Sequence, residues 1–254
     1  MEEATKAREP WDLKAGDARI ADSLNTFIIF CEDEHHEKLY FQSFEDRVPN
    51  IKINAISNLR AKKLNLIATI QIGVQKGLIG FENGSYRILD GVTEHLWCVY
   101  DRDMEFLDWA MIPEHNHVDF DTAIITAEGA GLKVAWSNDV FEMWLLLHFE
   151  SIPQGSILHR TYIYDRLTYI FKNNVPHDAE MVELTANDTF NYKVNMKRRE
   201  RFINQVIPLL HPLTETAIAN AILLEKQFDV HVPFHLRNPC TMVHYLVQEI
   251  MSGK

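Results

Sequence analysis

Short apolar segments alternate with helical patterns through the first 150 residues, and this alternation constrains the fold more than any other feature. Four segments have the apolar or alternating composition of buried strands: residues 26–31, 50–57, 94–100 and 132–137. Helical patterns lie between and after them, at 34–46, 61–78, 119–129 and 139–150. Strands separated by helices predict an α/β fold, with a mostly parallel, Rossmann-like sheet flanked by helices.

The second part of the chain has a different pattern. Strand signals fade after residue 150, and helical patterns follow at 156–172, 188–206, 213–227 and 239–251. We therefore predict an N-terminal tail (1–25), an α/β core (26–150) and a helical C-terminal extension packed on the core (151–254). Within the core, Asn83-Gly84 between apolar residues predicts a β-hairpin.

Composition and cysteine usage favour a cytoplasmic protein. The first 25 residues contain no apolar run of signal-peptide length. The apolar run around "MWLLLHF" is far shorter than the roughly 20 residues of a membrane helix. Cys31, Cys98 and Cys240 are too scattered for a disulfide framework or a CxxC metal site. We expect no membrane association.

The net charge of −11 opposes passive coating of nucleic acid, which requires positive potential. It leaves room for an enzyme with a local basic groove, because metal ions can neutralise an acidic site. The strongly basic segment 193–201 makes Lys197, Arg198 and Arg199 candidates for contact with nucleic-acid phosphates. A solvated helix surface is the alternative interpretation of this segment.

Carboxylates follow two of the predicted strands directly. Glu32 comes after the strand 26–31, and Asp101 and Asp103 come after the strand 94–100. Functional groups of open parallel sheets gather beyond the carboxyl ends of the strands, so these carboxylates meet if the two strands are neighbours. Such hard oxygen ligands suit Mg²⁺ or Mn²⁺. Taken singly, each acid could instead be a cap or turn residue.

Other polar residues surround this predicted edge. Ser137 and Asn138 are expected to cap the helix that follows the strand 132–137. His35 and His36 could bind a softer metal or donate a proton, but exposure on a helix surface is the favoured interpretation.

Three further side chains could extend the site. His117 lies in a segment predicted to be a loop and could reach the metal edge. Glu37 could orient the site or face water. Glu105 could add a ligand for a second metal ion.

A glutamate at the end of a first strand and a DxD at the end of a later strand form the pattern of Toprim domains. The chain most closely resembles their RloB-like branch. "IIFCEDEHHEKLYF" (28–41) is similar to that family's opening, "GLKVAWSNDVFEMWLLLHFE" (131–150) to its most specific segment, and "RNPCTMVHYLVQEI" (237–250) to its closing helix. The resemblance covers about residues 26–251.

This resemblance implies a Toprim fold and a metal-dependent, nuclease-like site. Glu32 matches the glutamate that acts as general base or acid and as a possible metal ligand. Asp101 and Asp103 match the metal-binding DxD, for Mg²⁺ or Mn²⁺. Glu142 matches a later glutamate that could serve as a further acid or ligand.

The resemblance also implies partners. RloB-like proteins are known mostly as partners of an AAA/ABC-type ATPase in prokaryotic defence or restriction-associated loci. The resemblance therefore implies an effector of antiviral defence, an endonuclease for DNA or for RNA, including tRNA. The alternative is a catalytically inactive scaffold that serves as a regulatory or nucleic-acid-binding subunit. Formation of a homo-oligomer is open.

The chain departs from the family pattern at three positions. Asp33 replaces a glycine, His36 a threonine and Asp139 a proline. None of these changes removes a key carboxylate, so we expect metal binding to survive, with an altered turn at Asp33.

Overall fold

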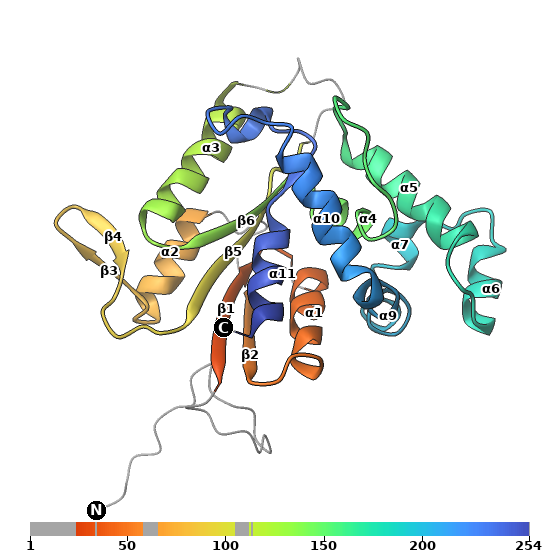
Figure 1. Cartoon of the computed structure of the whole chain (residues 1–254), viewed down its shortest axis with the longest axis horizontal. Coiled ribbons are helices and arrows are strands. Elements are labelled where there is room, and N and C mark those ends of the chain that lie inside the picture. Colours follow the sequence, from red (N-terminus) through yellow and green to blue (C-terminus); the bar gives the residue numbers. More distant parts are fainter. Residues whose placement is uncertain (1–23, 34, 58–65, 105–111, 113, 254) are drawn as a thin grey trace, which may run out of the picture.

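A five-stranded sheet forms the centre of the computed structural model, which describes residues 24–33, 35–57, 66–104, 112 and 114–253. The strand order is β2-β1-β5-β6-β7. These strands are β1 (Asn25–Cys31), β2 (Ile51–Ser57), β5 (His95–Asp101), β6 (Lys133–Asn138) and β7 (Cys240–Thr241). All neighbouring pairs are parallel except β6 and β7. The predicted mostly parallel α/β sheet is confirmed, and it is consistent with a Toprim-like fold (Figure 1).

Strand β1 shows why the sequence has continuous apolar runs. Its side chains alternate between the two sheet faces, and helices cover both faces, so every position from Phe27 to Cys31 is buried. Phe27 and Ile29 belong to one hydrophobic core cluster, whereas Ile28 and Phe30 belong to the other. The sheet therefore separates two apolar cores.

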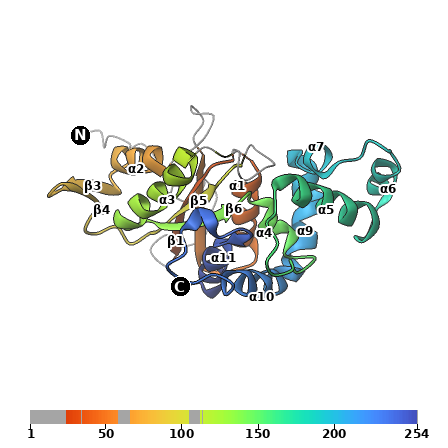
Figure 2. The ribbon, with the colours of Figure 1, turned by 90° about the horizontal axis from the view of Figure 1, so that it is seen from above.

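Helices α2 (Leu66–Gln75) and α3 (Glu114–Gly129) cover the face that carries Ile28 and Phe30 (Figure 2). Helices α1 (His36–Gln42), α4 (Glu142–Leu146) and α11 (Val243–Ser252) pack on the opposite face.

Strands β3 (Ile79–Glu82) and β4 (Ser85–Ile88) form the predicted hairpin. Asn83 and Gly84 both have positive φ, at 53° and 81°, as a two-residue turn of this handedness requires.

The C-terminal region consists mainly of short helices. They are α5 (Arg160–Asn173), α6 (Ala179–Thr185), α7 (Tyr192–Asn195), α8 (Arg199–Arg201), a π-helical turn (Phe202–Val206), α9 (Ile207–Leu210) and α10 (Thr214–Glu225). Short 3₁₀ turns occur at Ser43–Asp46, His211–Leu213 and Phe234–Leu236. The helical C-terminal region is confirmed in outline, while the division of the chain at residue 150 stays a prediction.

Several predicted boundaries were wrong, for local reasons. The helix predicted at 188–206 is interrupted because Asn191 and Arg198 have extended backbones. The segment predicted as a helix at 139–150 contains only α4, and helix α6 was not predicted. The segment predicted as a helix at 239–251 begins with strand β7, since Cys240 and Thr241 pair with the end of β6.

One helical stretch among the described residues, Arg199–Glu225, is long and apolar enough to span a membrane by length and composition alone. Core helices of soluble proteins meet the same criterion. Here Val206, Leu210 and Ala217 from this stretch are fully buried in the larger core cluster. These three side chains pack against the core, and 39% of the apolar window is buried.

Candidate active site

The carboxyl ends of β1 and β5 bring two predicted site residues into contact. The two strands are parallel neighbours, as the prediction required. Glu32, directly after β1, accepts a hydrogen bond through Oε2 from the backbone N–H of Asp101, at 3.1 Å. Asp101, the last residue of β5, accepts through Oδ2 from the N–H of Phe141, at 2.8 Å. The Asp101 carboxylate therefore lies between the end of β1 and the start of α4.

The other oxygen of this carboxylate has no partner. Asp101 Oδ1 is buried and accepts no hydrogen bond from any described residue. Burial raises the pKa of Asp101 well above its usual value, and the charges of Glu37, Glu32 and Glu142 raise it further. The site thus holds an acceptor oxygen in a field of negative charge, which favours a cation.

Glu32, Glu37, Asp101 and Glu142 form the carboxylate cluster of this site. The sequence left open whether Glu37 orients the site or faces water. The Glu37 side chain belongs to α1 and is only 2% exposed, so exposure to water is excluded. Burial raises its pKa well above the usual value, and the charges of Asp33 and Glu32 add to the rise. The usable signal was helical spacing, because Glu37 shares a helix face with buried Tyr40 and Phe41.

Glu142, at the start of α4, faces the same cluster and is only 4% exposed. Lys197 Nζ lies 2.6 Å from Glu142 Oε1, and the Tyr164 hydroxyl donates to Oε2 at 3.1 Å. Burial alone would lower the pKa of Lys197, but the ion pair with Glu142 raises it above the usual value. Lys197 therefore lies inside the carboxylate cluster as a fixed cation.

Asp33 and His36 hold the segment that carries Lys197. Asp33 Oδ1 accepts hydrogen bonds from the backbone N–H groups of His35 and His36, at 2.6 and 2.8 Å. His36 Nδ1 lies 3.0 Å from Asp33 Oδ2, and its Nε2 contacts the backbone oxygen of Lys197. The favoured expectation that His36 is solvated was wrong, since the residue is 8% exposed. Asp33 and His36, which both differ from the family pattern, thus form one hydrogen-bonded link to the backbone of Lys197.

Asp103, the second aspartate of the DxD, has a different environment. Its Oδ1 lies 2.7 Å from Arg160 Nη1. The same guanidinium binds Asp139 with two parallel hydrogen bonds, Nη2 to Oδ1 at 2.7 Å and Nε to Oδ2 at 3.1 Å. Asp139 is fully buried and also accepts from the N–H of Met104, at 2.6 Å. A proline at position 139 could accept none of these side-chain hydrogen bonds. The replacement of the family's proline by Asp139 therefore creates the contact between residue 139 and Arg160.

A basic cluster adjoins the carboxylates. Arg102, between the two aspartates of the DxD, donates to His117 Nδ1 at 2.5 Å and to the backbone oxygen of His235 at 2.6 Å. The rings of His117 and His235 lie 4.8 Å apart, and His235 pairs with Asp121 at 2.6 Å. Burial lowers the pKa of Arg102 to about 10. The loop predicted around His117 was wrong, because α3 begins at Glu114.

The prediction that Ser137 and Asn138 cap α4 was also wrong. Ser137 Oγ lies 3.0 Å from Thr241 Oγ1, and Asn138 bonds to Arg102 and to the backbone near His235. Instead, Asp101 accepts a hydrogen bond from the backbone N–H of Phe141, at the start of α4. Glu105 lies outside the described residues.

Within the described ranges, no three His, Cys, Asp or Glu side chains form a ready metal-binding group. The donor chemistry nevertheless suits a divalent cation. Asp101 Oδ1 is a buried acceptor without a partner among the described residues, and the charges of Glu37, Glu32 and Glu142 act on this carboxylate. The residues present therefore fit Mg²⁺ or Mn²⁺ at Asp101 and Glu32, whereas Asp103 already pairs with Arg160.

Arg198 and Arg199, the other predicted phosphate contacts, have exposed side chains next to Lys197. Their role stays a prediction. Sequence reasoning did not identify Arg160 or Tyr164, because the chain offers no local signal for contacts this remote in sequence.

We predict that Arg160→Ala lowers the free energy of unfolding by about 3 kcal/mol, because it leaves the buried charge of Asp139 unpaired. Arg166→Ala is the matched control. It removes a more exposed pair with Glu150 and should cost less than about 1 kcal/mol. Urea denaturation at neutral pH measures both values. Equal losses would contradict a special role for Arg160.

A family model described as RloB-like protein matches residues 27–250, which is most of the chain. Comparison with curated proteins and with solved structures found no match. The matched range contains the strand ends that carry Glu32 and Asp101, the α4 segment with Glu142 and all but the last two residues of helix α11. The chain belongs to the RloB-like family.

Proposed function

We propose that the chain is a cytoplasmic, metal-dependent nuclease of Toprim type that cleaves phosphodiester bonds. We further propose that it is an effector of a prokaryotic antiviral defence system and acts with an AAA/ABC-type ATPase. The main support is one observation: Glu32 contacts the end of β5 beside Asp101, whose buried Oδ1 has no partner in the part of the chain that the structure describes. Membership of the RloB-like family agrees with this proposal.

In this proposal, Glu32 and Asp101 hold Mg²⁺ or Mn²⁺. When bound, the ion stabilises negative charge on the phosphate oxygens during displacement. Asp103 is the less favoured ligand because Arg160 already neutralises it. Glu37 lies buried beside these residues, and its ionised form would strengthen cation binding.

The chain's own groups supply the remaining functions. Glu32 accepts a proton from the attacking nucleophile or returns one to the leaving group. Lys197, held 2.6 Å from Glu142, presents a positive charge at the site without a further metal ion. Arg198 and Arg199 follow it on an exposed segment and can contact the backbone of DNA or RNA on either side of the cleaved bond.

A specific observation also favours the rival function, an inactive scaffold that regulates or binds nucleic acid. Arg160 and Lys197 already neutralise Asp103 and Glu142. A site in which Arg and Lys side chains replace metal ions would keep the fold and lose catalytic activity. The two functions differ in whether the protein binds a divalent ion and cuts nucleic acid.

We predict that Asp101→Asn lowers metal-dependent cleavage of total tRNA or supercoiled plasmid by about a hundredfold or more, since it removes the charge that holds the ion. Asp188→Asn, a change of the same type at an exposed position, should leave cleavage unchanged. Cleavage of labelled substrates with Mg²⁺ or Mn²⁺ measures both variants.

The Asp101→Asn variant should remain folded. A raised carboxyl pKa means that the charged form costs stability above the ordinary pKa of the group, so a neutral side chain relieves that cost at neutral pH. An unfolding midpoint equal to or above that of the wild type checks this. If a folded Asp101→Asn variant cleaves nucleic acid at the wild-type rate, the nuclease site proposed here is excluded.

We also predict that Arg198→Ala combined with Arg199→Ala weakens nucleic-acid binding and reduces its salt dependence. If each arginine neutralises one phosphate, the slope of log affinity against log salt falls by about two. Arg87→Ala, at an exposed position on the β3–β4 hairpin, is the control. Fluorescence anisotropy across a salt series gives the slopes. Unchanged slopes would show that these arginines contact solvent only.

A further inference from the structure

The sheet has an open edge that the candidate active site does not use. Strand β7 pairs with β6 only at Ser137 and Asn138, and the chain then turns into α11. On that side, no strand of the described structure pairs with residues 133–136 of β6. Unpaired strand edges are templates for the addition of another strand.

The hydrogen bonds of neighbouring residues show which backbone groups face this edge. The oxygen of Ser137 accepts from Arg102 N–H on the β5 side, at 3.0 Å. The oxygen of Trp136 accepts from Met242 N–H on the opposite side, at 2.8 Å. Because backbone groups alternate in direction along a strand, the N–H and C=O of Val134 point to the open edge, like those of Trp136.

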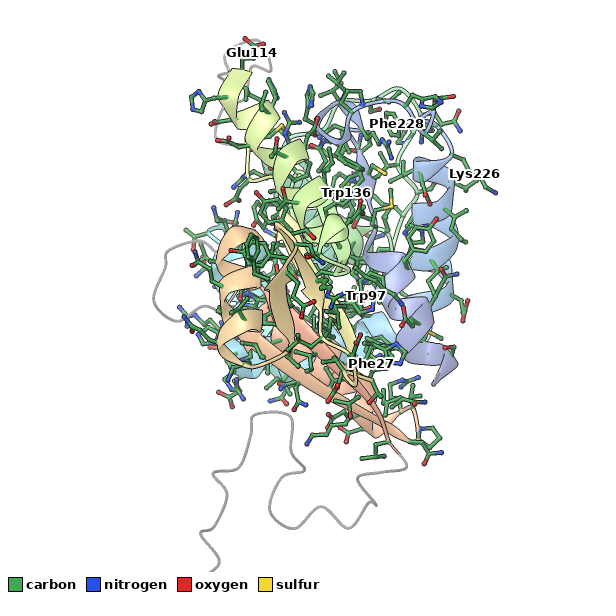
Figure 3. All side chains as sticks on the ribbon, turned by 90° about the vertical axis from the view of Figure 1, so that its left-hand side faces the viewer. Phe27, Trp97, Glu114, Trp136, Lys226 and Phe228 are labelled. Atoms are coloured by element: carbon green, nitrogen blue, oxygen red, sulfur yellow. The ribbon has the colours of Figure 1, made fainter. Side chains whose placement is uncertain are left out.

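A groove of about 510 Å³ lies along this edge. The consecutive residues Leu132, Lys133 and Val134 all line it. Successive side chains of a strand point to opposite faces, so a groove that touches all three lies beside the strand and not over one face. Figure 3 shows Trp97 and Trp136, which also line the groove, between α3 and the C-terminal helices.

The opposite wall comes from the C-terminal region. Phe234, Met242 and Tyr245 provide apolar and aromatic surface there. Trp97 is 4% exposed, and its Nε1–H has no acceptor among the described residues. The groove thus combines aromatic walls with an unpaired strand edge, which together suit an extended peptide.

The charges of the groove favour a basic occupant. Lys133 is satisfied by both oxygens of Glu249, at 2.8 and 2.6 Å. Glu128 and Arg237 also line the groove; burial raises the pKa of Glu128, and the charge of Arg237 acts to lower it. Glu225, a further lining residue, has no Lys or Arg partner among the ion pairs of the described residues; it lies 2.9 Å from the Tyr245 hydroxyl and 3.2 Å from His244. The Glu225 carboxylate is therefore available for a basic side chain.

We propose that this groove binds a basic, extended peptide segment of a partner protein, which adds to β6 as a further strand. The peptide backbone pairs with Val134, alternate apolar side chains contact the aromatic walls, and a Lys or Arg side chain reaches Glu225. This proposal is independent of the proposed nuclease activity, because the groove contains none of its residues.

A peptide-display library tests the proposal on the full-length protein. Peptides are selected on the wild type and counter-selected on Val134→Pro, which removes the edge-facing N–H and spares the bonds to β5. The expected result is a family of peptides that alternate apolar and basic residues and fail to bind Val134→Pro. Absence of any peptide that prefers the wild type would overturn the proposal.

Two further measurements keep the test decisive if Val134→Pro does not fold. Methylation of alternate backbone nitrogens in the selected peptide should abolish binding, because it removes the strand hydrogen bonds. Glu225→Gln should weaken binding about fivefold, the effect of a partly exposed ion pair, whereas Glu180→Gln on α6 should have no effect. Binding that survives methylation, or that is equal in both Gln variants, would overturn strand addition by a basic peptide.

Discussion

Electrostatic repulsion among closely spaced carboxylates governs the arrangement of the candidate site and of the region that covers it. Glu32, Glu37, Asp101 and Glu142 lie close enough to raise the pKa of Asp101 and of Glu37 by their mutual charge, in addition to burial. A fold does not retain such a cluster unless cations offset it or function requires it. The sheet topology creates the cluster, because parallel neighbours β1 and β5 end at the same edge.

The C-terminal region supplies the offsetting cations. Arg160, at the start of α5, neutralises Asp103 and Asp139, and Lys197, between α7 and α8, neutralises Glu142. The region after residue 150 is therefore part of the site as well as a cover for the core. It also contributes β7 to the sheet and the far wall of the groove beside β6. A change in the position of these helices would alter the charge balance at the carboxylates directly.

The sequence predicted the sheet and the meeting of Glu32 with Asp101, because apolar periodicity and strand-end positions are local signals. Sequence-based prediction was wrong where contacts between residues far apart in the chain determine the structure. The sequence around Asp103 does not indicate that Arg160 binds it. The sequence around Ser137 does not indicate that its hydroxyl forms a hydrogen bond with Thr241. His36 has the composition of a surface residue, yet contact with the Lys197 backbone buries it. The interrupted helices of the C-terminal region follow from backbone conformations at Asn191 and Arg198 that periodicity does not encode.

We propose that the carboxylates at the ends of β1 and β5 bind a divalent cation. Calorimetric titration of Mn²⁺ into the wild type, Glu32→Gln and Glu183→Gln tests it without any substrate or partner. Glu183 lies on the exposed side of α6 and serves as the matched control. We expect saturable binding by the wild type and by Glu183→Gln, and a loss of affinity of about tenfold or more in Glu32→Gln. Equal binding by all three proteins, or none by the wild type, would contradict it.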